Sequence, residues 1–305
     1  MKQGWQQELA LWWPGEIRWD VPMAAYSTLR AGGTATALIQ VDRSAALPGL
    51  IRWLEQHRVA WRVIGRGSNI LVRQQGFAGV VLRLGMEFGC IGIESIVGGG
   101  TTLHVGAACA LGRLVGWTVR RGLAGLEFVI GIPGSVGGAV RMNAGAWGGA
   151  LGDCLVGVSL CDRQGELCEL SRADFTPAYR GMQGPGIDDG VIVGARFVLG
   201  QERPEVLQAR CREYLQRRRA HQPRGMASAG SFFKNPAGDS AGRLIEAAGL
   251  KGLRRGDAMI SQRHANFLVN TGTASAADIV ALMAVVQERV QDAFGVHLEP
   301  EVHLL

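Results

Sequence analysis

Residues 121–152 read RGLAGLEFVIGIPGSVGGAVRMNAGAWGGALG. Ten of them are glycine, and each interior glycine costs a helix or strand about 0.5–1 kcal/mol relative to alanine. The apolar residues between them, among them Phe128, Ile130 and Trp147, are too numerous for a flexible linker. The stretch predicts a buried, sharply turning loop. Two interpretations stay open: the backbone N–H groups face a large anionic ligand, or the loop is only a tightly packed turn region.

Composition limits the classes to which the chain can belong. A length of 305 residues suggests two or three domains, and 47% apolar residues suffice for their cores. The net charge of +6 favours anionic small molecules or nucleic acid as partners. Six cysteines without paired spacing predict free thiols in a reducing compartment, with neither a disulfide framework nor a metal site.

The N-terminal residues, MKQGWQQELALWWPGEIRW, lack the apolar segment of about 7–15 residues that a signal peptide contains. No window approaches the roughly 18 uncharged apolar residues of a membrane span. We therefore expect a cytoplasmic protein. Four tryptophans lie within the first nineteen residues, and we expect them to dock on the body of the protein rather than serve an interface.

Apolar periodicity predicts a small α/β unit near the N-terminus. A strand at 36–41 is followed by a helix from Ser44 and by strands at 61–64 and 79–84. The loop Gly65-Arg66-Gly67-Ser68-Asn69 contains half of a dinucleotide-binding fingerprint, but the third glycine and the following helix are missing. It either binds phosphate through consecutive N–H groups or is an ordinary hairpin turn.

The central part of the chain predicts a second domain. Strands are expected at 101–105, 155–160, 166–170 and 191–199, with one helix over 109–121. A basic helix follows over 206–219, and most of its arginines are expected to face solvent.

The C-terminal part holds AGSFFKNP at 229–236, which Gly230 and Pro236 predict to be extended. An extended chain places Ser231 and Asn235 on one face, where both either reach one ligand or are satisfied within an ordinary strand. Helices are expected over 239–248 and from Ser275 to Gly295, with strands at 266–270 and at the C-terminus.

Eight motifs extend over nearly all of residues 22–305. They are STLRAGGTA (27–35), GRGSNILV (65–72), GIPGSVGGAVRMNAGAWGG (131–149), YR (179–180), AGSFFKNP (229–236), AGRLIEAAGLKG (241–252), HANFLVN (264–270) and LEPEV (298–302). In this order, the motifs together resemble the UDP-N-acetylenolpyruvoylglucosamine reductase family, flavoenzymes of bacterial cell-wall precursor synthesis.

The resemblance implies an α+β fold: a two-subdomain FAD-binding module of the vanillyl-alcohol-oxidase type plus a C-terminal α+β substrate domain. The first subdomain would comprise residues 1–84, joined by a returning strand at 298–305. The second subdomain would comprise residues 85–205, and the substrate-binding domain residues 206–297.

The resemblance also implies non-covalently bound FAD lying between the two subdomains. Residues Gly65, Arg66, Gly67, Ser68 and Asn69 would surround its pyrophosphate. The other residues implied to contact FAD are Ile132, Pro133, Gly134, Ser135, Gly137, Gly138, Asn143, Gly145, Gly148 and Arg218.

The implied reaction consists of two half-reactions. NADPH reduces FAD, and FADH2 gives a hydride to C3 of UDP-N-acetylglucosamine enolpyruvate while a proton reaches C2, which forms UDP-N-acetylmuramate. Ser231 matches the proton donor, Arg180 the arginine facing the substrate carboxylate, and Glu301 the carboxyl group that assists the intermediate. The implied substrate contacts are Tyr179, Lys234 and Asn235.

The sequence departs from the family pattern in a few places. The family often reads Tyr-Arg-x-Ser, whereas residues 179–182 read Tyr-Arg-Gly-Met, which puts a secondary contact in question. No insertion carries the extra substrate-clamping tyrosine, which is typical of the shorter subclass. Asp257 and Met259 stand where small or amide residues are common.

Two alternatives remain. An FAD-dependent oxidase of the same fold often attaches its flavin through a histidine in the glycine loop, and residues 65–69 contain none. A basic nucleotide- or nucleic-acid-binding module without catalysis has only the arginines of 206–219 in its favour. We therefore expect small-molecule partners without nucleic acid or membrane, and a monomer.

Overall fold

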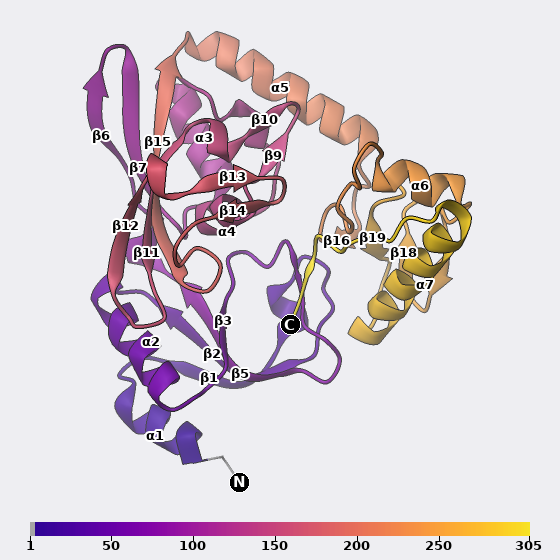
Figure 1. Cartoon of the computed structure of the whole chain (residues 1–305), viewed down its shortest axis with the longest axis horizontal. Coiled ribbons are helices and arrows are strands. Elements are labelled where there is room, and N and C mark those ends of the chain that lie inside the picture. The colour runs from indigo at the N-terminus through magenta and orange to yellow at the C-terminus, as the bar shows by residue number, and fades with distance from the viewer. Residues whose placement is uncertain (1–3) are drawn as a thin grey trace. The chain divides into compact units, whose positions relative to one another are not determined.

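The computed structural model describes residues 4–305, which divide into two compact units (Figure 1). The first unit contains the N-terminal residues up to Arg18, 38–65 and 79–216, and the second contains 19–37, 66–78 and 217–305. The chain thus passes between the units repeatedly, once within the loop 65–69. The domain boundaries expected from the sequence stay predictions.

A four-stranded sheet has the order β1 (Ile17–Pro22), β2 (Thr34–Val41), β5 (Phe77–Leu84) and β3 (Trp61–Val63). Helix α2 (Leu47–Gln56) buries Leu47, Leu50, Ile51 and Leu54, as their helical spacing predicts. Helix α1 (Gly4–Trp12) was not predicted. Trp12 stacks on Trp53 of α2 with the ring centroids 5.8 Å apart, so the expected docking of the N-terminal tryptophans is confirmed for this residue.

The first unit also contains a six-stranded antiparallel sheet. Its main order is β12 (Leu167–Ser171), β11 (Leu155–Cys161), β15 (Val191–Gln201), β7 (Gly100–Gly106) and β6 (Ile91–Val97), and β8 (Leu123–Ala124) pairs with β15. Helix α3 (Leu111–Arg120) contributes Leu114 and Val115 to the same core. Four of these strands and the helix were predicted, whereas the edge strand β6 was missed because most of its residues are exposed.

The glycine-rich stretch is more regular than its composition predicts. It contains helix α4 (Val136–Arg141) and two short paired strands, β9 (Gly145–Ala146) and β10 (Gly149–Ala150). The prediction of a loop throughout is therefore wrong. Burial of Val136, Ala139 and Val140 offsets the cost of glycine in α4. A Cβ at Gly137 would lie 2.8 Å from the Cβ of Ala107, so glycine permits this close packing.

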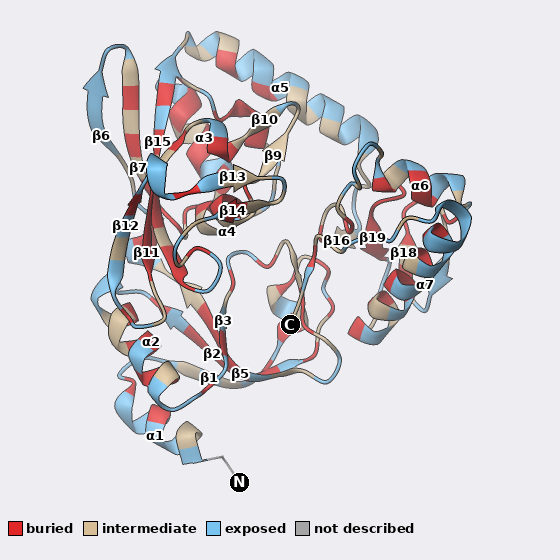
Figure 2. Cartoon of the chain, in the orientation of Figure 1, coloured by how far each residue is buried: buried red, intermediate tan, exposed pale blue. Residues whose placement is uncertain are grey.

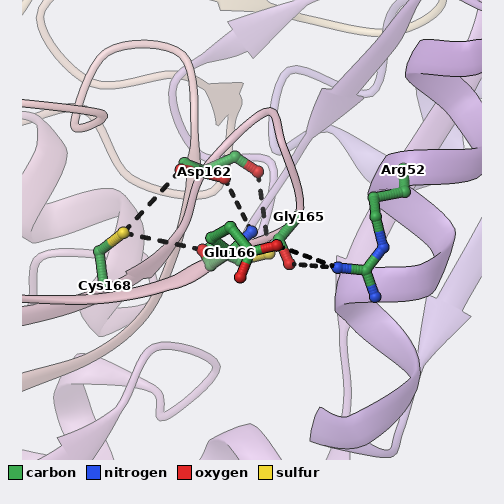
Figure 3. Close-up of polar contacts among 6 residues, drawn as sticks. Arg52, Asp162, Gly165, Glu166 and Cys168 are labelled. Atoms are coloured by element: carbon green, nitrogen blue, oxygen red, sulfur yellow. Dashed lines mark hydrogen bonds and ion pairs between the residues drawn. The ribbon is translucent and has the colours of Figure 1, made fainter.

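Polar contacts join α2 to the turn between β11 and β12 (Figure 3). The Arg52 Nη1 group donates to the carbonyl of Gly165 at 3.1 Å and lies 3.4 Å from the Glu166 carboxylate. Within the turn, the Glu166 N–H donates to the Asp162 carboxylate at 2.8 Å. These contacts tie the segment 38–65 to the large sheet of the same unit.

The second unit has an antiparallel sheet in the order β16 (Ala227–Ser228), β19 (Leu268–Asn270), β18 (Ala258–Ile260) and β17 (Arg254–Arg255). Helices α6 (Ala241–Ala247) and α7 (Ala276–Phe294) bury apolar faces in one core with it (Figure 2). Ser275 and Asp278 form the predicted capping box, and Gly295 ends α7 with φ 67°. Helix α5 (Pro204–His221), which belongs to the first unit up to Gln216, carries the arginines of the predicted basic helix. Among residues 4–305, no helix is long and apolar enough to cross a membrane.

Two neighbouring residues of α2 allow a direct comparison of apolar burial and a surface ion pair. Leu50 is fully buried, whereas the Arg52 side chain is 48% exposed. We expect Leu50→Ala to lower the free energy of unfolding by about 2–5 kcal/mol and Arg52→Ala by less than about 1 kcal/mol. Urea unfolding of both variants at one fixed FAD concentration measures the difference. Equal losses would show that the α2 ion pair is as important as its apolar packing.

Candidate functional site

The loop Gly65-Arg66-Gly67-Ser68-Asn69 is constrained by residues that precede it by about forty positions. Gly67 has φ 67°, and a Cβ built on it would lie 1.7 Å from the carbonyl oxygen of Tyr26. The Thr28 N–H donates to the Gly67 carbonyl at 2.9 Å, and the Ser27 hydroxyl donates to the carbonyl of Ile70. Residues 66–69 are therefore packed against preceding segments of the second unit. The strands that flank the loop do not pair with each other, so the loop is not an ordinary hairpin turn.

The other end of this loop approaches the glycine-rich stretch inside the first unit. A Cβ on Gly65 would lie 2.3 Å from the hydroxyl oxygen of Ser135, the buried residue directly before α4. The Ser135 side chain thus lies directly against the Gly65 backbone, which leaves no room for a side chain at position 65. Such a close approach fits a pyrophosphate-containing cofactor that must pass close to main-chain N–H groups.

The last residues of the chain lie along the loop's C-terminal half. Strand β20 (His303–Leu304) pairs in parallel with β4 (Ile70–Leu71). The Asn69 side-chain amide donates to the backbone carbonyl of Glu301 at 3.0 Å. The predicted terminal strand is much shorter than expected, because Pro300 has no N–H group with which to continue a ladder.

A second pairing brings the segment 231–235 beside the same terminal residues. Phe233 and Pro300 form an isolated antiparallel bridge. The Glu301 N–H donates to the Phe232 carbonyl and the Lys234 N–H donates to the Glu299 carbonyl, each at 2.8 Å. Ser231 and Glu301, assigned together by resemblance, therefore lie on directly adjacent segments of the second unit.

Asn266 holds the backbone of Phe232 and Phe233 in place, a role that was not predicted from the sequence. Its side chain is 3% exposed, accepts from the Phe233 N–H at 2.9 Å and donates to the Phe233 carbonyl at 2.8 Å. Its own carbonyl accepts from the Phe232 N–H. One buried amide thus satisfies both backbone groups of Phe233. The HANFLVN motif was the available signal, because a buried polar side chain amid apolar residues requires partners.

The structure changes the interpretation of two residues near Ser231. The Lys234 Nζ atom lies 2.6 Å from the Glu299 carboxylate, and the Asn235 carboxamide oxygen accepts from the Ala241 N–H at the start of α6. Phe232 and Phe233 are both buried in the core of the second unit, although neighbouring residues of an extended chain point to opposite faces.

Asp257, whose role the sequence left open, stabilises a turn. Its carboxylate accepts from the N–H and the hydroxyl of Thr273. These hydrogen bonds hold the pKa of Asp257 below its usual value, because they favour the ionised form.

Tyr179 and Arg180 form the tip of a hairpin in the first unit. Strands β13 (Thr176–Ala178) and β14 (Gly181–Gln183) pair so that Ala178 lies opposite Gly181, which leaves two residues in the turn. Arg180 has φ 55°, a left-handed conformation that is uncommon for arginine. Its Nη1 group donates to the carbonyl of Gly145 at 3.4 Å, within the glycine-rich stretch.

Arg218 is distinguished from its neighbours on α5 by burial. It is half-buried whereas Arg217 and Arg219 are exposed. Burial lowers the pKa of Arg218, because desolvation disfavours the charged form. Arg218 thus differs from its two neighbours in burial, and its contact with FAD stays a prediction.

Comparison with known proteins first defines the class. Residues 35–171 match the family model of an FAD-binding domain, and residues 222–305 match that of the C-terminal domain of UDP-N-acetylenolpyruvoylglucosamine reductase. The matched FAD-binding domain contains the loop 65–69 and the glycine-rich stretch. The chain is therefore a flavoprotein with an FAD-binding module followed by a separate C-terminal domain, as predicted.

Full-length relatives define the family. The UDP-N-acetylenolpyruvoylglucosamine reductase of Desulfosudis oleivorans is 42% identical over 100% of this chain and 99% of its own length. That of Alkalilimnicola ehrlichii is 45% identical over 96% of this chain and 95% of its own. The crystal structure of the Thermus caldophilus enzyme superposes with a TM-score of 0.79 at 37% identity, covering 95% of this chain and 98% of that one. The chain belongs to the UDP-N-acetylenolpyruvoylglucosamine reductase family and is an FAD-dependent oxidoreductase, which confirms the predicted family.

Gly67→Ala tests the loop. The added Cβ meets the Tyr26 carbonyl, and alanine in the left-handed region costs about 1–2 kcal/mol. We expect FAD affinity to fall at least about tenfold, measured as flavin absorbance retained after desalting and by titration of the apoprotein. The matched control is Gly112→Ala in α3, where the Cβ meets nothing within 4 Å. Full FAD retention by Gly67→Ala would contradict the interpretation of the loop as a cofactor-binding element.

Proposed function

We propose that this chain reduces UDP-N-acetylglucosamine enolpyruvate to UDP-N-acetylmuramate with NADPH as reductant, in peptidoglycan precursor synthesis. Family membership over the full length supports this activity. The observation that carries it is the pair of backbone hydrogen bonds that joins the Ser231 segment to the Glu301 segment. When bound, FAD supplies the hydride transfer between NADPH and the enolpyruvyl group.

Ser231 is the proposed proton donor to C2 of the substrate. A serine hydroxyl is a weak acid, so it must be held at contact distance from a strongly basic enolate carbon. The adjacent Phe232 and Phe233 are fully or nearly fully buried, and their backbone groups are bonded to Asn266 and Glu301. This rigid support fits a residue whose reactivity depends on position.

Glu301 is the proposed carboxyl group that assists the same intermediate. Its N–H is held by Phe232 and its carbonyl by the Asn69 amide, so its backbone is fixed from two directions. Asn69 would thereby link the cofactor loop to the residue that acts on the substrate.

Arg180 is the proposed partner of the substrate carboxylate. A planar guanidinium binds a carboxylate through two parallel hydrogen bonds, and a fixed cation gains most where negative charge develops. Its left-handed turn position and its contact with Gly145 restrict the side chain before substrate binds. Tyr179, Lys234 and Asn235 are proposed as further substrate contacts, and Arg66, Ser68 and Arg218 as FAD contacts.

An anaerobic titration tests the function. One equivalent of NADPH should bleach the flavin absorbance, and addition of UDP-N-acetylglucosamine enolpyruvate should restore it with formation of UDP-N-acetylmuramate. NADH at the same concentration serves as the comparison reductant. Flavin that is reoxidised by O₂ but not by this substrate would favour an oxidase of the same fold and contradict the proposal.

Ser231→Ala separates the two half-reactions. We expect FAD and its reduction by NADPH to persist, while substrate reduction falls about 10²–10⁴-fold because the positioned acid is lost. Stopped-flow absorbance follows each step separately. Ser228→Ala in the neighbouring strand β16 is the control. Near-normal substrate reduction by Ser231→Ala would remove Ser231 as the proton donor.

A further inference from the structure

The hairpin that carries Arg180 is too small to fix its tip by itself. Strands β13 and β14 have three residues each and form a separate two-stranded sheet. Such a hairpin is marginally stable in isolation, so its position depends on contacts with its surroundings. Phe175 and Met182 anchor its base in the core of the first unit. The tip residues themselves are not buried, and Tyr179 is 56% exposed.

Asn143 contacts the residue directly before the tip. Its Nδ2 group donates to the carbonyl of Ala178 at 2.9 Å, and its Oδ1 atom accepts from the N–H of Gly152 at 2.8 Å. The side chain is 8% exposed. One amide thus holds the end of the glycine-rich stretch and the residue directly before the Tyr179-Arg180 turn.

Asparagine meets two requirements of this position together. The backbone of Asn143 has φ 40°, which asparagine, aspartate and glycine tolerate better than other residues. The partners are a carbonyl and an N–H group, which require a donor and an acceptor on one short side chain. Aspartate would retain the acceptor but turn an oxygen toward the Ala178 carbonyl.

Two neighbours of Asn143 in the glycine-rich stretch bind residues 180–190, which follow Ala178. Gly145 accepts from the Arg180 guanidinium, and Arg141 donates to the carbonyls of Asp188 and Gly190 at 2.6 Å each. Residues 141–145 comprise the last residue of α4 and the four that follow it. They therefore bind the polypeptide before, at and after the Arg180 turn.

We infer that Asn143 is a positioning residue for Arg180, which orients the arginine for the substrate carboxylate through the Ala178 carbonyl. This inference rests on the proposed role of Arg180. It also gives Asn143 a function different from the direct FAD contact expected from resemblance.

A double-mutant cycle with Asn143→Asp, Arg180→Ala and the double variant tests the inference. In the wild-type background, we expect Asn143→Asp to slow reoxidation of the reduced flavin by substrate about 10–100-fold. In the Arg180→Ala background the same change should cost less than about threefold, because the two residues act as one unit. Asn143→Asp should slow the reduction of flavin by NADPH much less than it slows the reoxidation of reduced flavin by substrate.

Asn270→Asp is a matched control in the second unit. Asn270 is also buried, donates to the Leu29 carbonyl and accepts from the N–H groups of Gly272 and Ala274. If Asn143→Asp acted only through a general loss of structural integrity, Asn270→Asp should slow the substrate step by a similar factor. Asn270→Asp should also have the same fold effect in the wild-type and the Arg180→Ala backgrounds. If Asn143→Asp does not fold, Asn143→Gly, which keeps the left-handed backbone, replaces it in the cycle.

The outcomes separate the inference from the proposed function. Equal effects of Asn143→Asp in both backgrounds, or a loss of FAD affinity as large as the loss in the substrate step, would overturn the positioning role while leaving Arg180 in place. An Arg180→Ala variant that reduces substrate normally would instead refute the proposed role of Arg180, and the inference with it.

Discussion

Backbone pairing between the C-terminus and residues 69–73 is the interaction on which the second unit's site depends. The His303 N–H donates to the Asn69 carbonyl, the Leu305 N–H to the Leu71 carbonyl, and the Arg73 N–H to the Leu305 carbonyl. These bonds fix the path of residues 299–301, which in turn hold the segment that contains Ser231. Asn69, the segment with Glu301 and the segment with Ser231 are therefore parts of one hydrogen-bonded assembly.

In the first unit, by contrast, side chains that bind backbone carbonyls hold the segment around Arg180. Arg141 and Asn143 each contact main-chain groups of the segment 178–190. Side chains are needed here because the hairpin offers little apolar surface and its short strands pair only with each other. Desolvation lowers the pKa of Arg141, although Asp188 and Asp189 favour its charged form. The Arg141 guanidinium thus has a structural role, because it binds the backbone carbonyls of Asp188 and Gly190.

Periodicity predicted the elements whose residues bury one regular face. Helix α7, with its capping box and its terminal glycine, and helix α2 were both evident from spacing alone. Helix α4 was missed, since tertiary burial of Val136 and Val140 outweighs the low helix propensity of two glycines. Strand β6 was missed because an exposed edge strand has no buried face to reveal it.

The candidate site could be predicted only in part, because its contacts are long-range. Ser231 and Glu301 were identified by resemblance to a family, and no local spacing indicates that their segments pair. Asn266 was not identified, and Asn143 was expected only as an FAD contact, because the structural role of a buried amide is recognised by its partners, which lie 33 and 35 positions away. The left-handed backbone of Arg180 was likewise not predicted.

The pairing of the terminal residues with the loop also has a consequence for biosynthesis. The hydrogen-bond partner of the Asn69 side chain is the carbonyl of Glu301, which lies 232 positions later in the chain. At about 5–20 residues per second, the ribosome needs on the order of 10–50 s to supply it. During that interval β4 lacks its pairing partner β20. A nascent chain that stalls before residue 299 therefore leaves the loop 65–69 without the segment that holds Asn69 and Ile70.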